Sequence, residues 1–183
     1  VKNGETYKLS KRSGKAVTLE TLLDEVPIDA ARYVFNSKEP NTHLEFDLDL
    51  AVEQSSQNPV YYVQYAHARI CSILKNLAAE GIVSKPLTVS QMECLTEGAE
   101  MELIRHLGAL PEEIVEAARV YDPSKITRYA MDLATLFHKF YNACRVKGED
   151  ESLTQARLNL CIAVKTVIKN VLTMLKINAP ESM

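Results

Sequence analysis

The chain has 183 residues, of which 46% are hydrophobic and 25% charged, and a formal net charge of −3. This composition is typical of an ordinary soluble globular protein with one large or two small domains. No apolar run approaches the ~20 residues that a membrane span requires, and the polar, basic start lacks the apolar core of a signal peptide. We therefore expect a cytoplasmic protein with no membrane partner.

The first notable stretch is YKLSKRSGK, residues 7–15, which carries four cations. Such a cluster is tolerated when it is solvated or when an anion neutralises it, so a solvated arm and a phosphate contact are the two interpretations. A Gly-x-x-x-x-Gly-Lys-Ser/Thr phosphate loop is excluded, because Leu9 and Ala16 stand where that motif needs a glycine and a hydroxyl.

Helix signals dominate the rest of the chain. Thr18 can cap a short helix that Pro27 closes, and Pro27 also fits the start of a second helix. Residues 44–50 alternate apolar and acidic side chains, and we expect them to be an extended segment that leads into a helix at residues 51–54. A helix beginning at Asn58-Pro59 is predicted to run to Gly81, which starts a linker.

Further helices are predicted at about residues 97–107, 111–121, 124–144 and 152–175, with Gly108 ending the first of them before Pro111. The last two carry continuous apolar stripes at three- and four-residue spacing. We therefore expect an all-α fold, an antiparallel helical bundle joined by short loops.

Charge is distributed unevenly: residues 1–16 carry a net +4, residues 17–123 a net −11 and residues 124–176 a net +5. The two basic regions predict two places where a polyanion binds, although solvated helix faces would explain the same charges. On the last helix Lys165, Lys169 and Lys176 are spaced to form a row of cations on one face, away from the core.

The cysteines and histidines indicate no metal site. The four cysteines form no C-x-x-C pair, so we expect reduced thiols. His67 and Cys71 lie four residues apart on one predicted helix face, which is half of a metal site, but no second pair accompanies them. We expect His138 to be a partly exposed helix residue rather than a catalyst.

Several segments together resemble arginyl-tRNA synthetases. Lys8-Leu9-Ser10-Lys11-Arg12 resembles the KMSKS loop of class I synthetases, with Leu9 and Arg12 as departures. The segments that follow it in the family's order are FDLDLA (46–51), NPVYYVQYAHARI (58–70), residues 132–142, and residues 156–183, where Ala156-Arg157-Leu158 is similar to the DALR motif. The resemblance implies that residues 1–57 are the end of a class I catalytic domain and residues 58–183 a DALR-type anticodon-binding domain.

For the catalytic loop, the resemblance implies a role in forming arginyl-adenylate from arginine and ATP with Mg²⁺. Lys8, Ser10, Lys11 and Arg12 would contact the leaving pyrophosphate as its charge develops. No HIGH motif precedes this loop, and His106-Leu107-Gly108-Ala109 lacks the second histidine. We therefore expect a carboxyl-terminal piece that is inactive alone, with no tightly bound cofactor.

For the helical part, the resemblance implies binding to the anticodon side of arginine tRNAs. Tyr141 lies where an apolar helix stripe meets a polar loop, so its ring can be half buried and still stack on a base. The predicted tRNA contacts are Tyr141, Asn142, Arg145, Lys165, Lys169 and Met183. We expect a monomer. The alternative is a non-catalytic helical RNA-binding or protein-adaptor module, whose acidic middle would bind another protein.

Overall fold

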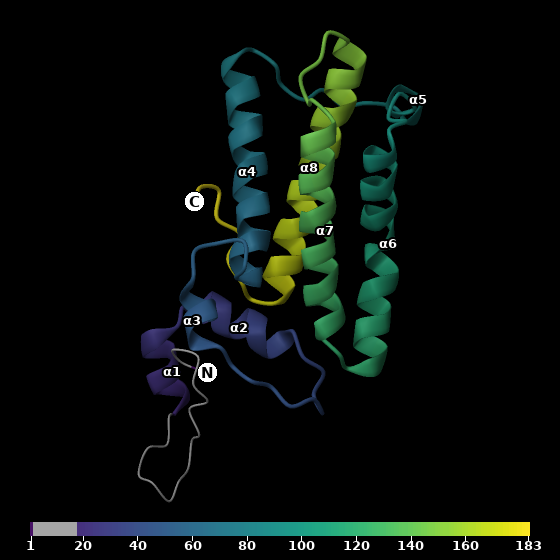
Figure 1. Ribbon diagram of the computed structural model, residues 1–183. Helices are drawn as coiled ribbons and strands as arrows, with labels where there is room; N and C mark the ends of the chain where they lie inside the picture. Colours follow the sequence, from purple (N-terminus) through teal and green to yellow (C-terminus); the bar gives the residue numbers. More distant parts are fainter. Residues whose placement is uncertain (2–17) are drawn as a thin grey trace, which may run out of the picture.

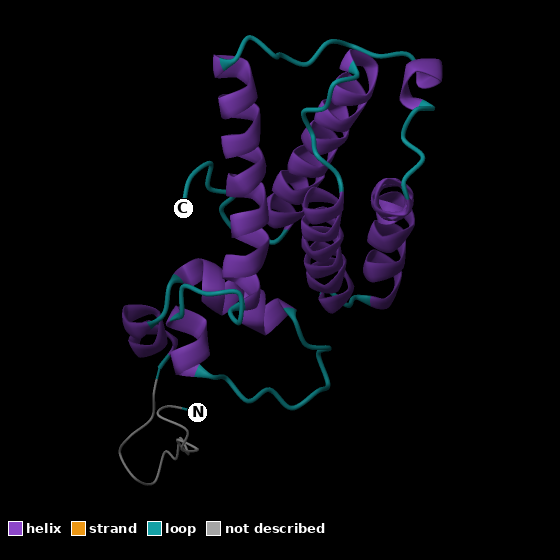
Figure 2. Ribbon diagram, turned by 45° about the horizontal axis from the view of Figure 1, so that its top comes forward, coloured by secondary structure: helices purple, strands orange, loops and turns teal. Residues whose placement is uncertain are grey.

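The computed structural model describes residue 1 and residues 18–183, and within this part of the chain every regular element is a helix (Figure 2). The all-α prediction is confirmed. Lys8, Ser10, Lys11 and Arg12 lie outside the described residues. The helices are α1 (Leu19–Glu25), α2 (Ile28–Asn36), α3 (Leu48–Val52), α4 (Pro59–Ala79), α5 (Val89–Met92), α6 (Gly98–Val120), α7 (Ser124–Ala143) and α8 (Glu151–Met174).

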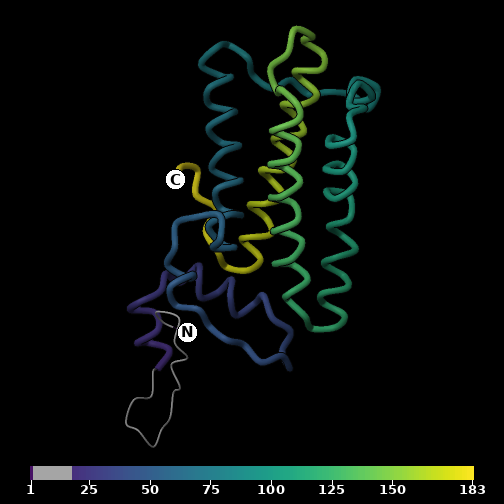
Figure 3. The backbone as a smooth tube through the Cα atoms, in the orientation of Figure 1, coloured from purple at the N-terminus to yellow at the C-terminus, as the bar shows by residue number. Residues whose placement is uncertain are grey.

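The four long helices form the bundle, and the three first helices lie together at one end of it (Figure 1). Helix α7 is the central element, since it packs against α4, α6 and α8. Helix α4 also contacts α8 and, through its beginning, α2. The tube in Figure 3 shows the carboxyl-terminal tail, residues 175–183, leaving α8 and returning beside α4. The bundle therefore places α4 between the carboxyl-terminal tail and α7.

The predicted apolar stripes form the core. On α7, Phe137 and Phe140 are fully buried, and on α8 Val164, Ile168 and Leu172 are fully buried. Burying one such side chain contributes roughly 1.5–3 kcal/mol, so stripes that meet over several turns dominate the stability of the bundle. None of the helices in the described ranges combines the length and apolar composition needed to cross a membrane.

Helix α6 corrects the prediction of two separate helices, because it continues through Gly108 and Pro111. Proline inside a helix removes one hydrogen bond, here to the carbonyl of Leu107, and costs about 3 kcal/mol. Pro111 lies on the exposed side of the helix. Leu103 and Ala117, on opposite sides of the proline, are both buried in the common core, and their packing keeps the helix continuous.

The start of α3 and the lysine row on α8 differ from the sequence prediction for local reasons. Helix α3 begins three residues early, because the Asp47 side chain accepts a hydrogen bond from the Leu50 amide and caps the helix. Lys176 does not continue the lysine row, because α8 has already ended and Lys176 has φ of 57°. The Ile177 amide bonds the Leu172 carbonyl there, which is the Schellman pattern of a helix end. The one-turn helix α5 was not predicted.

The carboxyl-terminal tail fastens α2 to α4. The Asp29 carboxylate on α2 accepts hydrogen bonds from the backbone amide and side-chain amide of Asn178 and from Nε2 of Gln64 on α4. Gln64 also donates to the Asn178 carbonyl at 2.9 Å, and His67 Nδ1 lies 2.8 Å from the Pro180 carbonyl oxygen. One carboxylate thus joins three segments that are far apart in sequence.

We expect Asp29→Ala to lower the free energy of unfolding by about 1–2 kcal/mol, because three donors lose a charged acceptor at a partly buried position. Urea unfolding followed by circular dichroism measures this change. Asp24→Ala, which removes an exposed carboxylate from α1, is the matched control and should change stability by less than about 0.5 kcal/mol. Equal midpoints for the two variants would show that the tail is not held by Asp29.

Candidate nucleic-acid interface

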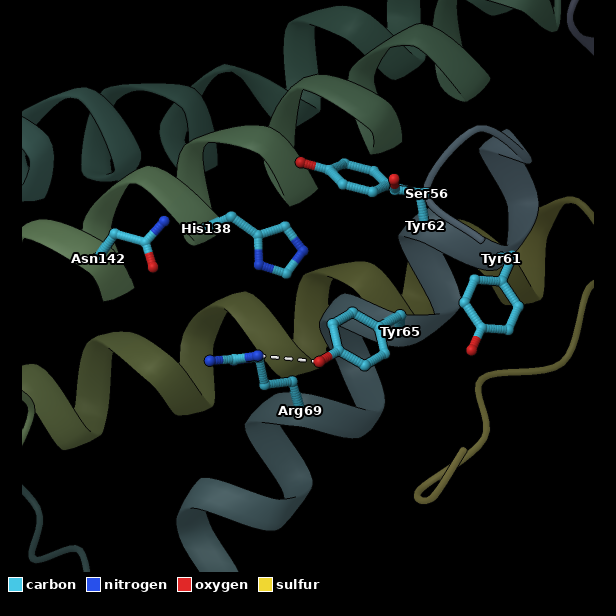
Figure 4. Close-up of a pocket in the computed structure, with 7 residues that line it drawn as sticks. All are labelled: Ser56, Tyr61, Tyr62, Tyr65, Arg69, His138 and Asn142. Carbon is cyan, nitrogen blue, oxygen red and sulfur yellow. Dashed lines mark hydrogen bonds between the residues drawn. The ribbon is translucent and has the colours of Figure 1, made fainter. Parts of the chain in front are cut away.

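A cavity of about 480 Å³ opens between α4 and α7 (Figure 4). Helix α4 contributes three tyrosines and an arginine, and α7 contributes a histidine and an asparagine. The lining residues are Ser56, Tyr61, Tyr62, Tyr65, Arg69, His138 and Asn142. Aromatic rings therefore make up most of its wall, with amide and guanidinium groups among them.

The local sequence fixes how α4 presents these rings. Asn58 precedes Pro59 at the start of α4, and its side-chain amide donates to the carbonyls of Ala51 and Glu53, which ties the helix start to the preceding turn. From there, side chains four residues apart share one helix face. Tyr61, Tyr65 and Arg69 have this spacing and point toward the same cavity.

The side chains of the cavity wall contact one another through their rings and through the Arg69 guanidinium. The Tyr61 and Tyr65 rings are nearly parallel, with centroids 6.4 Å apart. Arg69 Nη1 donates a hydrogen bond of 2.9 Å to the Tyr65 hydroxyl, and its guanidinium carbon lies 4.6 Å from the centroid of the Tyr141 ring. Arg69 thus contacts both helices: it hydrogen-bonds Tyr65 of α4 and makes a cation–π contact with Tyr141 of α7.

His138 lies among aromatic rings. Its ring centroid is 5.0 Å from that of Tyr62, 6.0 Å from that of Tyr65 and 5.5 Å from that of Phe137. Burial lowers the pKa of His138, and the nearby positive charge of Arg69 lowers it further. The imidazole is therefore neutral at pH 7. His138 thus contributes an uncharged, flat side chain to the cavity wall, rather than a second cation.

A second cavity of about 450 Å³ is lined by other residues of α4 and by the end of α7. Its wall comes from the later turns of α4, from the end of α7 and from the loop after α7. The lining residues are Ile73, Asn76, Leu77, Tyr141, Cys144, Arg145, Val146 and Lys147. The structure thus brings together three residues predicted from sequence: Asn142 lines the first cavity, and Tyr141 and Arg145 line the second.

The remaining predicted contacts lie elsewhere. Lys165 and Lys169 on α8 are near His67 of α4, whose pKa is lowered chiefly by burial and further by these two cations. Lys165 is half buried rather than on an open face, and neither lysine lines either of these two cavities. Met183, 52% exposed, ends the tail that runs beside α4 (Figure 1).

Sequence reasoning missed most of the first cavity. It assigned no site role to Tyr61, Tyr62, Tyr65 or Arg69, and it treated His138 as an ordinary helix residue. The four-residue spacing of Tyr61, Tyr65 and Arg69 was an available signal, because side chains four residues apart lie on one face of a helix. The contribution of His138 could not be read from the same helix, since it comes from α7.

The arrangement can bind flat, unpaired bases. Tyrosine rings and guanidinium planes stack on nucleobases, and a nearby arginine or lysine neutralises phosphate. Within the described ranges, no three histidine, cysteine or acidic side chains are grouped to hold a metal ion, and the four cysteines are free thiols.

Known proteins are similar to this chain in sequence and in fold. Arginine–tRNA ligases of Ruminiclostridium cellulolyticum and Caldanaerobacter subterraneus are 52% and 50% identical to it over 100% of the chain, which covers 32% and 33% of those proteins. The solved Thermus thermophilus arginyl-tRNA synthetase matches with a TM-score of 0.72 and 28% identity, over 94% of this chain and 29% of that one.

The chain thus spans about a third of the length of the curated relatives it matches. Its residues 63–183 match the family model described as the DALR anticodon binding domain. This range contains most of α4 and all of the helices that follow it, and therefore the walls of both cavities apart from Ser56, Tyr61 and Tyr62. The chain belongs to the DALR anticodon binding domain family.

Proposed function

We propose that this chain is the tRNA-binding portion of an arginine–tRNA ligase and holds the anticodon side of an arginine tRNA in the groove between α4 and α7. The observation that carries the proposal is the tyrosine-lined first cavity, where Arg69 donates a hydrogen bond to Tyr65 and lies over the ring of Tyr141, which lines the second cavity. The family match and the names of the relatives support the same assignment.

The binding mechanism follows from the side chains. An anticodon loop presents unstacked bases, and their flat faces can lie against the tyrosine rings of α4. Arg69 adds positive charge beside these rings. His138 is neutral, so it gives a base a flat surface without adding a second cation. Lys165 and Lys169 would attract the phosphate backbone, and Met183 would contact the anticodon from the tail.

For the longer protein we propose that Lys8, Ser10, Lys11 and Arg12 act in the ATP-dependent formation of arginyl-adenylate, before arginine is transferred to the tRNA. Here ATP with Mg²⁺ and arginine are substrates. The support is that the similarity to arginine–tRNA ligases extends over residues 1–57 as well as over the helical bundle. In this proposal residues 1–57 are the end of the catalytic domain.

A salt titration of tRNA binding tests the proposal. Affinity should fall steeply as salt rises, because bound cations displace counterions from phosphate. If Lys165 and Lys169 each contact a phosphate, Lys165→Ala and Lys169→Ala should each reduce the slope of log K against log salt by about one. The measurement is fluorescence anisotropy of a labelled arginine tRNA at several salt concentrations.

The matched control is Arg105→Ala, which removes an exposed cation from α6, a helix that lines neither cavity. Its slope should equal that of the parent chain. If all three variants keep the parent slope, the two lysines do not contact RNA. If the parent chain itself does not bind tRNA, the proposed function is wrong and the result favours the protein-adaptor interpretation.

A further inference from the structure

Three side chains of α2 and α4 determine where the chain can end. Asp29, Gln64 and His67 bond the carboxyl-terminal tail at two points, and we call them the tail latch. We propose that Asp29 is a positioning residue for RNA binding, because it fixes the tail so that Met183 lies beside the RNA. The inference rests on the proposed function and adds to it a residue that lines neither cavity.

The Asp29 carboxylate is the centre of the tail latch. Its Oδ2 accepts hydrogen bonds from the Asn178 backbone amide at 3.2 Å, from Asn178 Nδ2 at 3.1 Å and from Gln64 Nε2 at 3.1 Å. A charged acceptor forms stronger hydrogen bonds than a neutral one. Asn178 lies 149 positions after Asp29 in sequence. One carboxylate in the segment before the bundle therefore holds the other end of the chain.

The second point of the tail latch lies two residues further along the tail. Nδ1 of His67 is 2.8 Å from the Pro180 carbonyl oxygen and donates to it, since a carbonyl group can only accept. Residues 181–183, which follow this point, are exposed. Three residues span at most about 11 Å, so Met183 stays within that distance of the latch.

Helical spacing places the tail latch next to the wall of the first cavity. Gln64 follows Tyr61 by three residues, and side chains three apart are neighbours on a helix surface. Tyr61 lines the first cavity. The tail lies beside α4 in both ribbon and tube (Figures 1 and 3). The latch thus confines the exposed end of the tail to a part of α4 that adjoins the cavity, where Met183 can contact bound RNA.

The direction of the effect distinguishes positioning from charge. Removing a carboxylate lowers the repulsion of RNA and by itself should strengthen binding slightly. If Asp29 positions the tail, Asp29→Ala should instead weaken the binding of an arginine tRNA by about fivefold, the effect of one lost contact. Fluorescence anisotropy at fixed salt measures it. Asp24→Ala, the matched control, removes an exposed carboxylate from α1 and should not weaken binding.

A shortened chain separates positioning from a general loss of stability. Deletion of residues 182–183 should itself weaken binding by about fivefold. Asp29→Ala should cause no further loss in the shortened chain, because the contact that it positions is already absent. Asp29→Asn keeps one carbonyl oxygen as an acceptor and should recover part of the affinity. Circular dichroism verifies that each variant is folded.

Amide hydrogen exchange tests the tail latch without RNA. The Asn178 amide donates to Asp29, so it should exchange about tenfold faster in Asp29→Ala than in the parent chain. The same amide should exchange in Asp24→Ala at the parent rate. NMR spectroscopy of the labelled chain measures these rates residue by residue.

Three results would overturn the inference while the proposed function stands. The first is an equal loss of affinity on Asp29→Ala in the parent and the shortened chain, which would make Asp29 a purely structural residue. The second is unchanged binding after the deletion of residues 182–183, and the third is an unchanged exchange rate of the Asn178 amide in Asp29→Ala. If the parent chain binds no arginine tRNA, the proposed function fails and the inference fails with it.

Discussion

Arg157→Ala is expected to lower the free energy of unfolding by about 3 kcal/mol, the largest effect on stability of the substitutions considered. The change leaves the fully buried Glu100 carboxylate without its cation and the Arg145 carbonyl without its donor. Removing one partner of a buried ion pair typically costs about 3–5 kcal/mol, because the remaining charge stays out of water. We expect a cost at the lower end of this range, because Glu100 Oε2 keeps the hydrogen bond that it accepts from the Glu97 amide. Urea unfolding measures the loss.

Two further variants separate the charge from the packing. Glu100→Gln/Arg157→Met removes both charges and should recover part of the loss, because no unpaired buried charge remains. Arg119→Ala breaks the exposed pair with Glu116 on α6 and should cost no more than about 1 kcal/mol. A cost for Arg157→Ala as small as that for Arg119→Ala would mean that water reaches Glu100.

Tyr141→Ala is expected to weaken the binding of an arginine tRNA by roughly tenfold or more at moderate salt. Base stacking contributes about 1–3 kcal/mol per base, and a factor of ten corresponds to about 1.4 kcal/mol. The same change removes the ring contacted by Arg69 and a wall of the second cavity. Anisotropy with labelled tRNA measures the loss, and circular dichroism verifies that the variant is folded.

Tyr141→Phe is the matched control, because it keeps the ring and removes only the hydroxyl. It should bind within about twofold of the parent chain if stacking is the contribution that matters. A tRNA with an exchanged anticodon should bind the parent chain less tightly and lose less affinity on Tyr141→Ala. Equal binding of both tRNAs by the parent chain and by Tyr141→Ala would exclude this tyrosine from the site.

Helix α4 serves two purposes through two of its faces. Tyr61, Tyr65 and Arg69 face the groove with α7, while Gln64 and His67 bond the carboxyl-terminal tail. The tail in turn bonds α2 through Asp29. Helix α4 therefore contacts both the proposed RNA site and the tail that bonds α2.

The sequence by itself determined the helices whose signals are local. Thr18, Asn58 and Gly81 mark helix boundaries, and the apolar stripes of α7 and α8 predict their length and buried face. These predictions succeed because capping and hydrophobic periodicity depend only on residues within a few turns of one another. The placement of Tyr141 at the edge of an apolar stripe is such a signal, and it correctly indicated a half-buried ring.

Only the tertiary structure decided which side chains meet. Helix α6 continues through Pro111 because the packing of both halves on the core outweighs a local penalty. The first cavity needs His138 from α7 beside Tyr65 from α4. Arg157 bonds the carbonyl of Arg145, a residue that lines the second cavity, and pairs with Glu100 57 positions away in sequence. Contacts between distant segments depend on how the helices pack, and helical periodicity gives the buried face of each helix without naming its partner.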